Sequence, residues 1–159
     1  MLIFQNNTLE MLCSHARAEY PEECCGILLG KRENGQRSVC SVIQTHNAAV
    51  EKQNKVHFLI DPLEALRAEI AAEQEQLEVV GFYHSHPDYD ASASDEDLLH
   101  MIPGYSYPII SIKNDECVSM RCFEKLLQAD TDAHEEILIK EKQNADFSIH
   151  FGNTASLCK

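Results

Sequence analysis

The sequence EVVGFYHSHP occupies residues 78–87 and carries the strongest structural signal in this chain. Its apolar and aromatic first half predicts a central strand over residues 78–84. Because strand side chains alternate between two faces, His84 and His86 are expected to point the same way. Asp97 follows eleven positions after the second histidine, at the predicted start of a short helix. Two imidazoles and one carboxylate form a ligand set suited to zinc, with a fourth position open for water, as in catalytic sites.

The segments around this strand carry alternating helix and strand signals. Thr8 is a candidate cap for a first helix, which the pair Tyr20-Pro21 is expected to end. Asn34-Gly35 is a strong hairpin-turn signal. Further strands are predicted over residues 25–30, 38–45, 57–60, 107–112 and 117–123, and a short helix over residues 94–100. This order predicts a mixed α/β fold in which a curved sheet lies between helices.

A second helix is expected to begin at Asp61, which can cap it, with Pro62 at the first helical position. Leu63, Leu66 and Ile70 recur at helical spacing. We therefore expect them to form the apolar stripe that packs on the core, opposite an acidic outer face.

Composition limits the class of protein. The 159 residues are 44% hydrophobic, which is enough for one core, and the net charge of −13 disfavours binding to nucleic acid or anionic membranes. We see no apolar run near 18 residues and no secretory signal at the amino terminus. The seven cysteines are scattered rather than arranged as a disulfide framework, which favours a reduced, cytoplasmic protein.

Metal-assisted hydrolysis needs a carboxylate that moves a proton and a donor that stabilises the oxyanion. Glu22 and Glu23 precede the strand predicted at residue 25, and either could lie across the strand that carries His84. Ser94 lies three residues before Asp97. That spacing also fits a helix cap with an acidic residue in the first turn, and the two roles are compatible.

These residues resemble the signature of the JAMM (MPN-plus) metalloprotease family, His-x-His-Pro followed by Ser-x-x-Asp. The match runs from His84 to Pro87 and then to Ser94 and Asp97. Residues 21–30, PEECCGILLG, resemble the family's upstream Pro-x-Glu-x-Cys-Gly segment, with Glu23 at the glutamate position.

The resemblance implies a zinc ion held by His84, His86 and Asp97. It also implies that Glu23 is the general acid and base and that Ser94 helps to stabilise the oxyanion. Such enzymes cleave after the C-terminal tail of ubiquitin or a ubiquitin-like protein, and the compact bacterial members act on sulfur-carrier proteins, removing cysteine or a short extension.

The resemblance covers roughly residues 8–125, so we expect a JAMM/MPN-like domain over residues 1–125 and a polar C-terminal extension over 126–159. Ala93 stands where the family usually has proline. The connection from Asp97 to the strand at residue 107 is short, which favours a simple carrier tail over linkage-specific deubiquitination. The oligomeric state is left open, and a homodimer is one alternative.

Two other functions compete with the peptidase. A scaffold of the same fold would bind metal without cleaving peptides and would not need Glu23 and Ser94 together. A deaminase-like hydrolase would require glutamate two residues after the first zinc histidine, where His86 stands, and a Cys-x-x-Cys that this sequence lacks.

Overall fold

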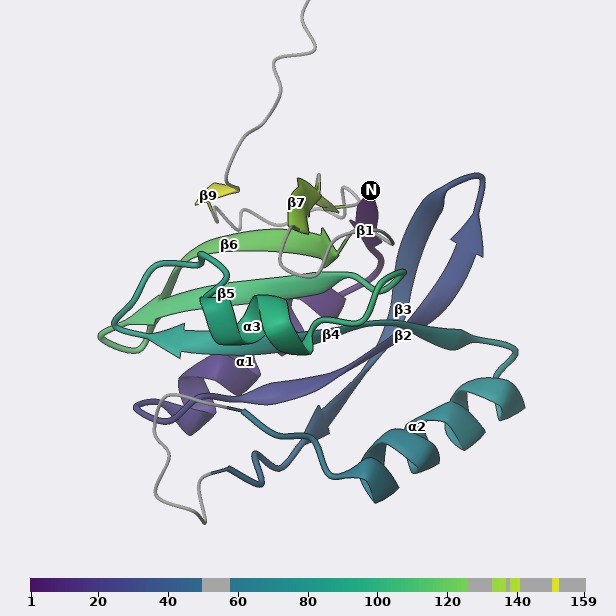
Figure 1. Cartoon of the computed structure of the whole chain (residues 1–159), viewed down its shortest axis with the longest axis horizontal. Helices are drawn as coiled ribbons and strands as arrows, with labels where there is room; N and C mark the ends of the chain where they lie inside the picture. The colour runs from purple at the N-terminus through teal and green to yellow at the C-terminus, as the bar shows by residue number, and fades with distance from the viewer. Residues whose placement is uncertain (50–57, 126–132, 137, 141–149, 152–159) are drawn as a thin grey trace, which may run out of the picture.

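The computed structural model describes residues 1–49, 58–125, 133–136, 138–140 and 150–151. The described strands form one mixed sheet in the order β7-β6-β5-β4-β2-β3-β1-β8, with β9 beside β6 (Figure 1). Helices cover both faces, as the predicted mixed α/β architecture requires. The elements are β1 (Leu2–Phe4), α1 (Thr8–Glu19), β2 (Cys25–Glu33), β3 (Gln36–Thr45), α2 (Pro62–Gln74), β4 (Glu78–Pro87), α3 (Asp95–His100), β5 (Tyr107–Lys113), β6 (Glu116–Lys125), β7 (Ala133–Glu136), β8 (Leu138–Lys140) and β9 (His150–Phe151).

Strand β4 lies at the centre of the sheet and continues to Pro87, three residues beyond its predicted end. It pairs antiparallel with β2 and parallel with β5. His84 is opposite Cys25 on one side and Ile109 on the other. The strand that carries the two histidines is therefore fixed on both edges by main-chain hydrogen bonds.

The two faces of β4 pack against different helices. Tyr83 belongs to the core cluster that includes Leu12 of α1, and its hydroxyl makes a 2.8 Å hydrogen bond with His15 Nδ1. Phe82 belongs to the clusters beside α2 and α3. Because side chains alternate along a strand, the histidines of β4 lie on the Phe82 side. The sheet thus separates α1 from the face that carries the site.

Helix α1 corrects one sequence prediction and confirms another. Asn7, not Thr8, is the residue before the helix, and no side chain caps it. The Thr8 hydroxyl instead donates to the Gln5 carbonyl at 2.7 Å, which stabilises the preceding turn. The helix ends at Glu19, directly before the predicted Tyr20-Pro21 stop.

Helix α2 has the predicted start but the opposite orientation. Asp61 caps it by accepting a hydrogen bond from the Leu63 amide, and Pro62 is its first residue. However, Ala68 and Ala72 are buried against the sheet, whereas Leu63 and Ile70 are about half-exposed or more. The prediction that the large apolar stripe faces the core is wrong. Small alanines let the helix approach a sheet face that already supplies large side chains.

The remaining differences involve short segments. Phe58, Leu59 and Ile60 do not form the predicted strand, and residue 57 lies outside the described residues. The three-residue strand β1, which pairs parallel with β3, was not predicted. Strands β7 and β8 add to opposite ends of the sheet order. Three or four residues of pairing leave too short a pattern to detect in the sequence.

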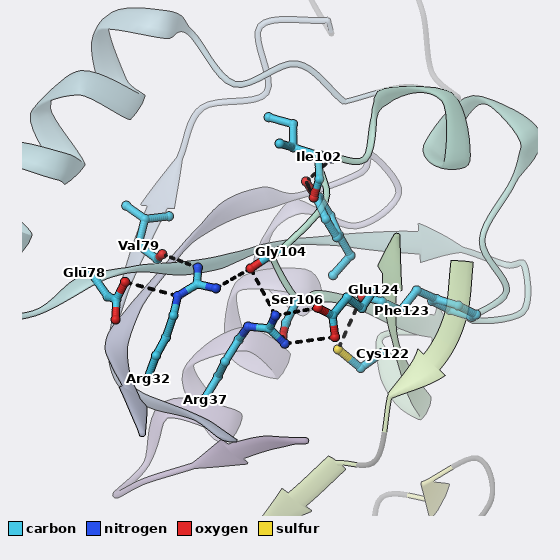
Figure 2. Close-up of polar contacts among 11 residues, drawn as sticks. Arg32, Arg37, Glu78, Val79, Ile102, Gly104, Ser106, Cys122, Phe123 and Glu124 are labelled. Atoms are coloured by element: carbon cyan, nitrogen blue, oxygen red, sulfur yellow. Dashed lines mark hydrogen bonds and ion pairs between the residues drawn. The ribbon is translucent and has the colours of Figure 1, made fainter. Parts of the chain in front are cut away.

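Two arginines fix the loop between α3 and β5 (Figure 2). Both Arg32 and Arg37 donate to the carbonyl of Gly104. Arg37 also forms a bidentate pair with Glu124 at 2.6 and 3.1 Å. The loop follows the helix that carries Asp97, so the two arginines help to position that side of the site.

We expect Arg37→Ala to lower the free energy of unfolding by about 3 kcal/mol, because it removes a bidentate, charged hydrogen-bond partner from the partly buried Glu124 carboxylate. The Arg37 and Glu124 side chains are only 11% and 21% exposed. Arg32→Ala is the matched control: Arg32 pairs with Glu78 at 32% and 50% exposure, so we expect a loss of about 1 kcal/mol or less. Equal losses in urea denaturation of the two variants would contradict this assignment.

Candidate metal and proton-transfer site

Three potential ligands meet where β4 ends beside α3. His84 Nε2 lies 3.0 Å from His86 Nε2 and 3.1 Å from Asp97 Oδ1. His86 Nε2 lies 3.6 Å from Asp97 Oδ2. Ligands placed tetrahedrally at zinc distances are separated by about 3.3 Å from one another. The three distances bracket that value, so the donor set has the chemistry and the spacing to hold a zinc ion.

The imidazole rings are held by contacts that the sequence did not reveal. His86 Nδ1 donates to the carbonyl of Asp90 at 2.9 Å, which leaves the lone pair of Nε2 directed at the site. Phe58 stacks on His84 with ring centroids 4.3 Å apart and an interplanar angle of 19°. His84 is almost fully buried. Both orienting groups come from loops outside the segments 21–30, 84–87 and 94–97 that carry the predicted site residues.

Ser94 and Asp97 form a reciprocal cap at the start of α3. The Ser94 hydroxyl accepts from the Asp97 amide at 3.1 Å, and the Ser94 amide donates to Asp97 Oδ2 at 2.7 Å. The Ser94 hydroxyl also donates to Asp97 Oδ2 at 2.6 Å. This geometry confirms the predicted capping box and holds the Asp97 carboxylate toward the two histidines.

Glu23 is the buried member of the Glu22-Glu23 pair, whereas Glu22 is half-buried. Its backbone is fixed by Asn47, whose side-chain amide donates to the Glu23 carbonyl at 3.0 Å. Burial raises the pKa of the Glu23 carboxyl to about 7, and the nearby charges of His86 and Asp97 act on it in opposite directions. A carboxyl of that pKa can both accept and donate a proton near neutral pH.

The charges at the site favour the metal-ligating protonation states of His84 and Asp97. Burial lowers the pKa of His84, which keeps its imidazole neutral. Burial opposes ionisation of Asp97, but hydrogen bonds from His84 and His86 outweigh it and hold the Asp97 pKa well below its usual range. For His86, burial lowers the pKa, but the interaction with Asp97, the hydrogen bond to the Asp90 carbonyl and the charge of Glu23 together outweigh burial and raise the pKa. Protons and a cation therefore compete for His86.

The buried Glu23 carboxyl predicts a pH effect on the metal-free protein. Its pKa rises from 4.5 in the unfolded chain to about 7 in the fold, so the neutral form is favoured by folding. This contribution is complete below pH 4.5 and is lost as the pH rises through 7, with a magnitude on the order of 3 kcal/mol. In chelator, we therefore expect Glu23→Gln to stabilise the protein at pH 8 relative to wild type, with little difference at pH 4.5. Urea denaturation at both pH values measures this, and an equal difference at both would contradict it.

An apolar cavity of about 550 Å³ opens beside the three candidate ligands. His84 and Asp97 lie in its wall together with Phe82, Met101 and Tyr107. Further wall residues come from the segment before α2 and from the start of that helix: Phe58, Leu59, Ile60, Pro62 and Ala65. Ligand sites typically combine such apolar walls with a few convergent polar groups.

The adjacent cysteines pack rather than ligate. Cys24 and Cys25 are buried, and burial raises the pKa of Cys24 to about 12 and that of Cys25 to about 11. The Cys24 amide donates to the Ser85 hydroxyl at 2.9 Å, which ties the Glu23 segment to β4. His100 is exposed, and its Nδ1 donates to the Glu96 carbonyl at 3.0 Å.

Known proteins resemble this chain in sequence and in fold. A desampylase from Haloferax volcanii is 36% identical over 108 residues, which cover 64% of this chain and 74% of that protein. A CysO-cysteine peptidase from Mycobacterium tuberculosis is 25% identical over 124 residues, covering 77% and 82%. The solution structure of a Desulfitobacterium hafniense protein superposes with a TM-score of 0.76 at 32% identity, covering 90% of this chain and 94% of the other.

The family described as prokaryotic homologs of the JAB domain matches residues 5–123. That range holds all five residues predicted from the sequence to form the site: Glu23, His84, His86, Ser94 and Asp97. It also covers most of the described sheet and the three helices found among the described residues. The chain therefore belongs to the family of prokaryotic homologues of the JAB domain.

Proposed function

We propose that this protein is a zinc-dependent peptidase of the JAMM type. It hydrolyses the bond that follows the C-terminal tail of a ubiquitin-like or sulfur-carrier protein, and it releases cysteine or a short extension. The observation that carries the proposal is the spacing of 3.0, 3.1 and 3.6 Å among the ligand atoms of His84, His86 and Asp97. The buried Glu23 carboxyl lies near enough for the charges of His86 and Asp97 to act on its pKa.

His84, His86 and Asp97 would hold the zinc ion through two Nε2 atoms and the carboxylate. Zinc, when bound, supplies a Lewis acid that polarises a carbonyl and acidifies a water molecule. The contacts around the ligands act before any chemistry occurs: the Asp90 carbonyl selects the His86 tautomer, and the cap at Ser94 orients Asp97.

Glu23 moves the proton in the proposed reaction. Its carboxylate accepts a proton from the attacking water and then delivers that proton to the leaving amine. In the metal-free protein, burial raises the pKa of Glu23 to about 7, so neither protonation state is strongly disfavoured at neutral pH before the metal binds. Burial also keeps bulk water from competing for the carboxylate.

Ser94 steadies the negative charge that develops on the scissile carbonyl oxygen. Its hydroxyl proton points at Asp97 Oδ2, 2.6 Å away, in the substrate-free geometry. The hydroxyl rotates toward substrate without breaking the two backbone hydrogen bonds of the cap. The cap thereby keeps the donor at the site while its proton changes partner.

The net charge, the described helices and the cysteines limit the class of partner and the location of the protein. The net charge of −13 disfavours nucleic acid and anionic membranes as ligands. None of the helices among the described residues has the length and apolarity needed to cross a bilayer. All the cysteines that lie in the described residues are free thiols, which supports a cytoplasmic location.

The direct test is the cleavage of a sulfur-carrier protein that bears one additional C-terminal cysteine, followed by intact mass. We expect the loss of that cysteine, complete inhibition by chelator, and recovery when zinc is returned. Unchanged substrate mass across a panel of ubiquitin-like and sulfur-carrier proteins would contradict the proposal and favour a scaffold.

A further inference from the structure

We propose that Asn47 is a positioning residue that sets the reach of the Glu23 carboxyl and connects it to the wall of the cavity beside His84. This inference rests on the proposed function and deepens it by naming a residue on which proton transfer depends. Asn47 follows β3 and is only 6% exposed. It lies outside the segments that carry the predicted site residues.

The backbone at Glu23 lies just outside the sheet. Strand β2 begins at Cys25, which is paired with Thr45 on one side and with His84 on the other. Glu23 comes two residues earlier, before either ladder begins. Its carbonyl accepts a hydrogen bond from Nδ2 of Asn47 at 3.0 Å. Asn47 therefore fixes the main chain at the point from which the Glu23 side chain extends.

The other end of the same amide holds the cavity wall. Asn47 Oδ1 accepts from the amide of Leu59 at 3.0 Å and from the amide of Ala49 at 3.1 Å. Leu59 and Ala49 both line the cavity. Phe58, directly before Leu59, stacks on His84 with ring centroids 4.3 Å apart. One buried side chain thus connects the segment of the proposed general base with the segment that packs on a candidate metal ligand.

These contacts determine how the Asn47 amide is oriented. The Glu23 carbonyl can only accept a hydrogen bond, and the amides of Ala49 and Leu59 can only donate one. The nitrogen of Asn47 must therefore face Glu23, and its oxygen must face the other two residues. An ionised aspartate would keep the acceptor and lose the donor, and an alanine would lose both. Substitution can accordingly separate the two ends of this side chain.

Proton transfer is sensitive to small displacements of the base. A general base must lie within about 2.6–3.2 Å, heavy atom to heavy atom, of the group whose proton it accepts. A misplacement of about 1 Å can cost about 100-fold in rate. The ligand atoms of His84, His86 and Asp97 are carried by β4 and α3, not by the Glu23 segment. Loss of the Asn47 amide should therefore lower turnover far more than it lowers zinc binding.

The test is a double-mutant cycle on wild type, Asn47→Ala, Glu23→Gln and the double variant. The substrate is a sulfur-carrier protein with an added C-terminal cysteine, and kcat, KM and zinc per chain are measured at saturating zinc. Asn47→Asp is the second variant, because it retains the acceptor for Leu59. Thr45→Val is the matched control: Thr45 is as deeply buried and donates to the Cys25 carbonyl at 3.0 Å, within the sheet.

We expect Asn47→Ala to lower kcat by about 10- to 100-fold in the wild-type background and by less than about 3-fold in the Glu23→Gln background. Asn47→Asp should lower kcat similarly and keep the wild-type KM, whereas Asn47→Ala should also raise KM as the wall at Leu59 loosens. Thr45→Val should lower the urea midpoint and keep the wild-type kcat. In chelator, the Leu59 amide should exchange with solvent faster in Asn47→Ala than in wild type or Asn47→Asp.

Wild-type kcat in both Asn47 variants would overturn the positioning role and leave the proposed function intact. So would an equally large loss in the Glu23→Gln background, or an equal loss of kcat in Thr45→Val, because either would assign the effect to general destabilisation. If Asn47→Ala does not fold, the same cycle is run with Asn47→Asp. If wild type cleaves no carrier tail, the proposed function fails first and the positioning role fails with it.

Discussion

Glu23→Gln should leave zinc bound and lower kcat by about 10²- to 10⁴-fold, the range that general acid–base catalysis contributes. The amide has the shape of the carboxylate but cannot accept the proton of the attacking water. The ligand atoms of His84, His86 and Asp97 are untouched, so the metal content should stay at the wild-type level. Zinc per chain and kcat are measured on the same preparation.

Glu22→Gln is the matched control for that experiment. The two glutamates are adjacent in the sequence, but Glu22 is half-buried while Glu23 is buried beside the ligands. We expect Glu22→Gln to retain nearly full activity. Substantial turnover by Glu23→Gln with zinc bound would show that another group moves the proton, and it would remove the catalytic role from Glu23.

Asp97→Asn should lower the zinc affinity by more than about 100-fold. That loss exceeds the usual effect of removing a residue that only hydrogen-bonds to a metal ligand. Asparagine removes the charged member of the ligand set. It also weakens the cap, because the Ser94 amide and hydroxyl both donate to Asp97 Oδ2. We expect activity to disappear together with bound zinc, as measured by metal competition and by cleavage.

Asp95→Asn provides the comparison, since Asp95 is exposed in the same first turn of α3 and lies outside the ligand cluster. It should retain both zinc and activity. Replacing Ser94 by alanine separates its two roles, which are to orient Asp97 through the cap and to stabilise the oxyanion. We expect zinc binding to survive while kcat falls. An Asp97→Asn protein that binds zinc as tightly as wild type would refute the proposed ligand set.

The sequence predicted that His84, His86 and Asp97 lie together, because each part of that arrangement depends on local spacing. Alternation along one strand places His84 and His86 on the same face, and a cap at Ser94 turns Asp97 toward them. The orienting groups could not be predicted in this way. Phe58 and the Asp90 carbonyl reach the imidazoles from loops, and their contacts depend on tertiary folding rather than on any repeat.

Helix α2 shows a different limit. Periodicity predicts which residues share a face, but it does not determine whether that face points inward. Both sides of α2 are apolar: leucine and isoleucine on one, Ala68 and Ala72 on the other. The sheet beneath supplies the large Ile27 and Leu29, so close packing favours the alanines. The volume available on the sheet decided the orientation, and that information lies elsewhere in the chain.

The most direct test of the whole account titrates zinc into chelator-stripped protein and follows bound zinc and carrier cleavage in the same samples. We predict that cleavage rises in proportion to bound zinc and saturates at about one ion per chain, as expected for a single three-ligand site. Cleavage that persists without zinc would contradict the metal mechanism. Stoichiometric zinc without cleavage of any carrier tail would contradict the peptidase and leave a metal-bearing scaffold.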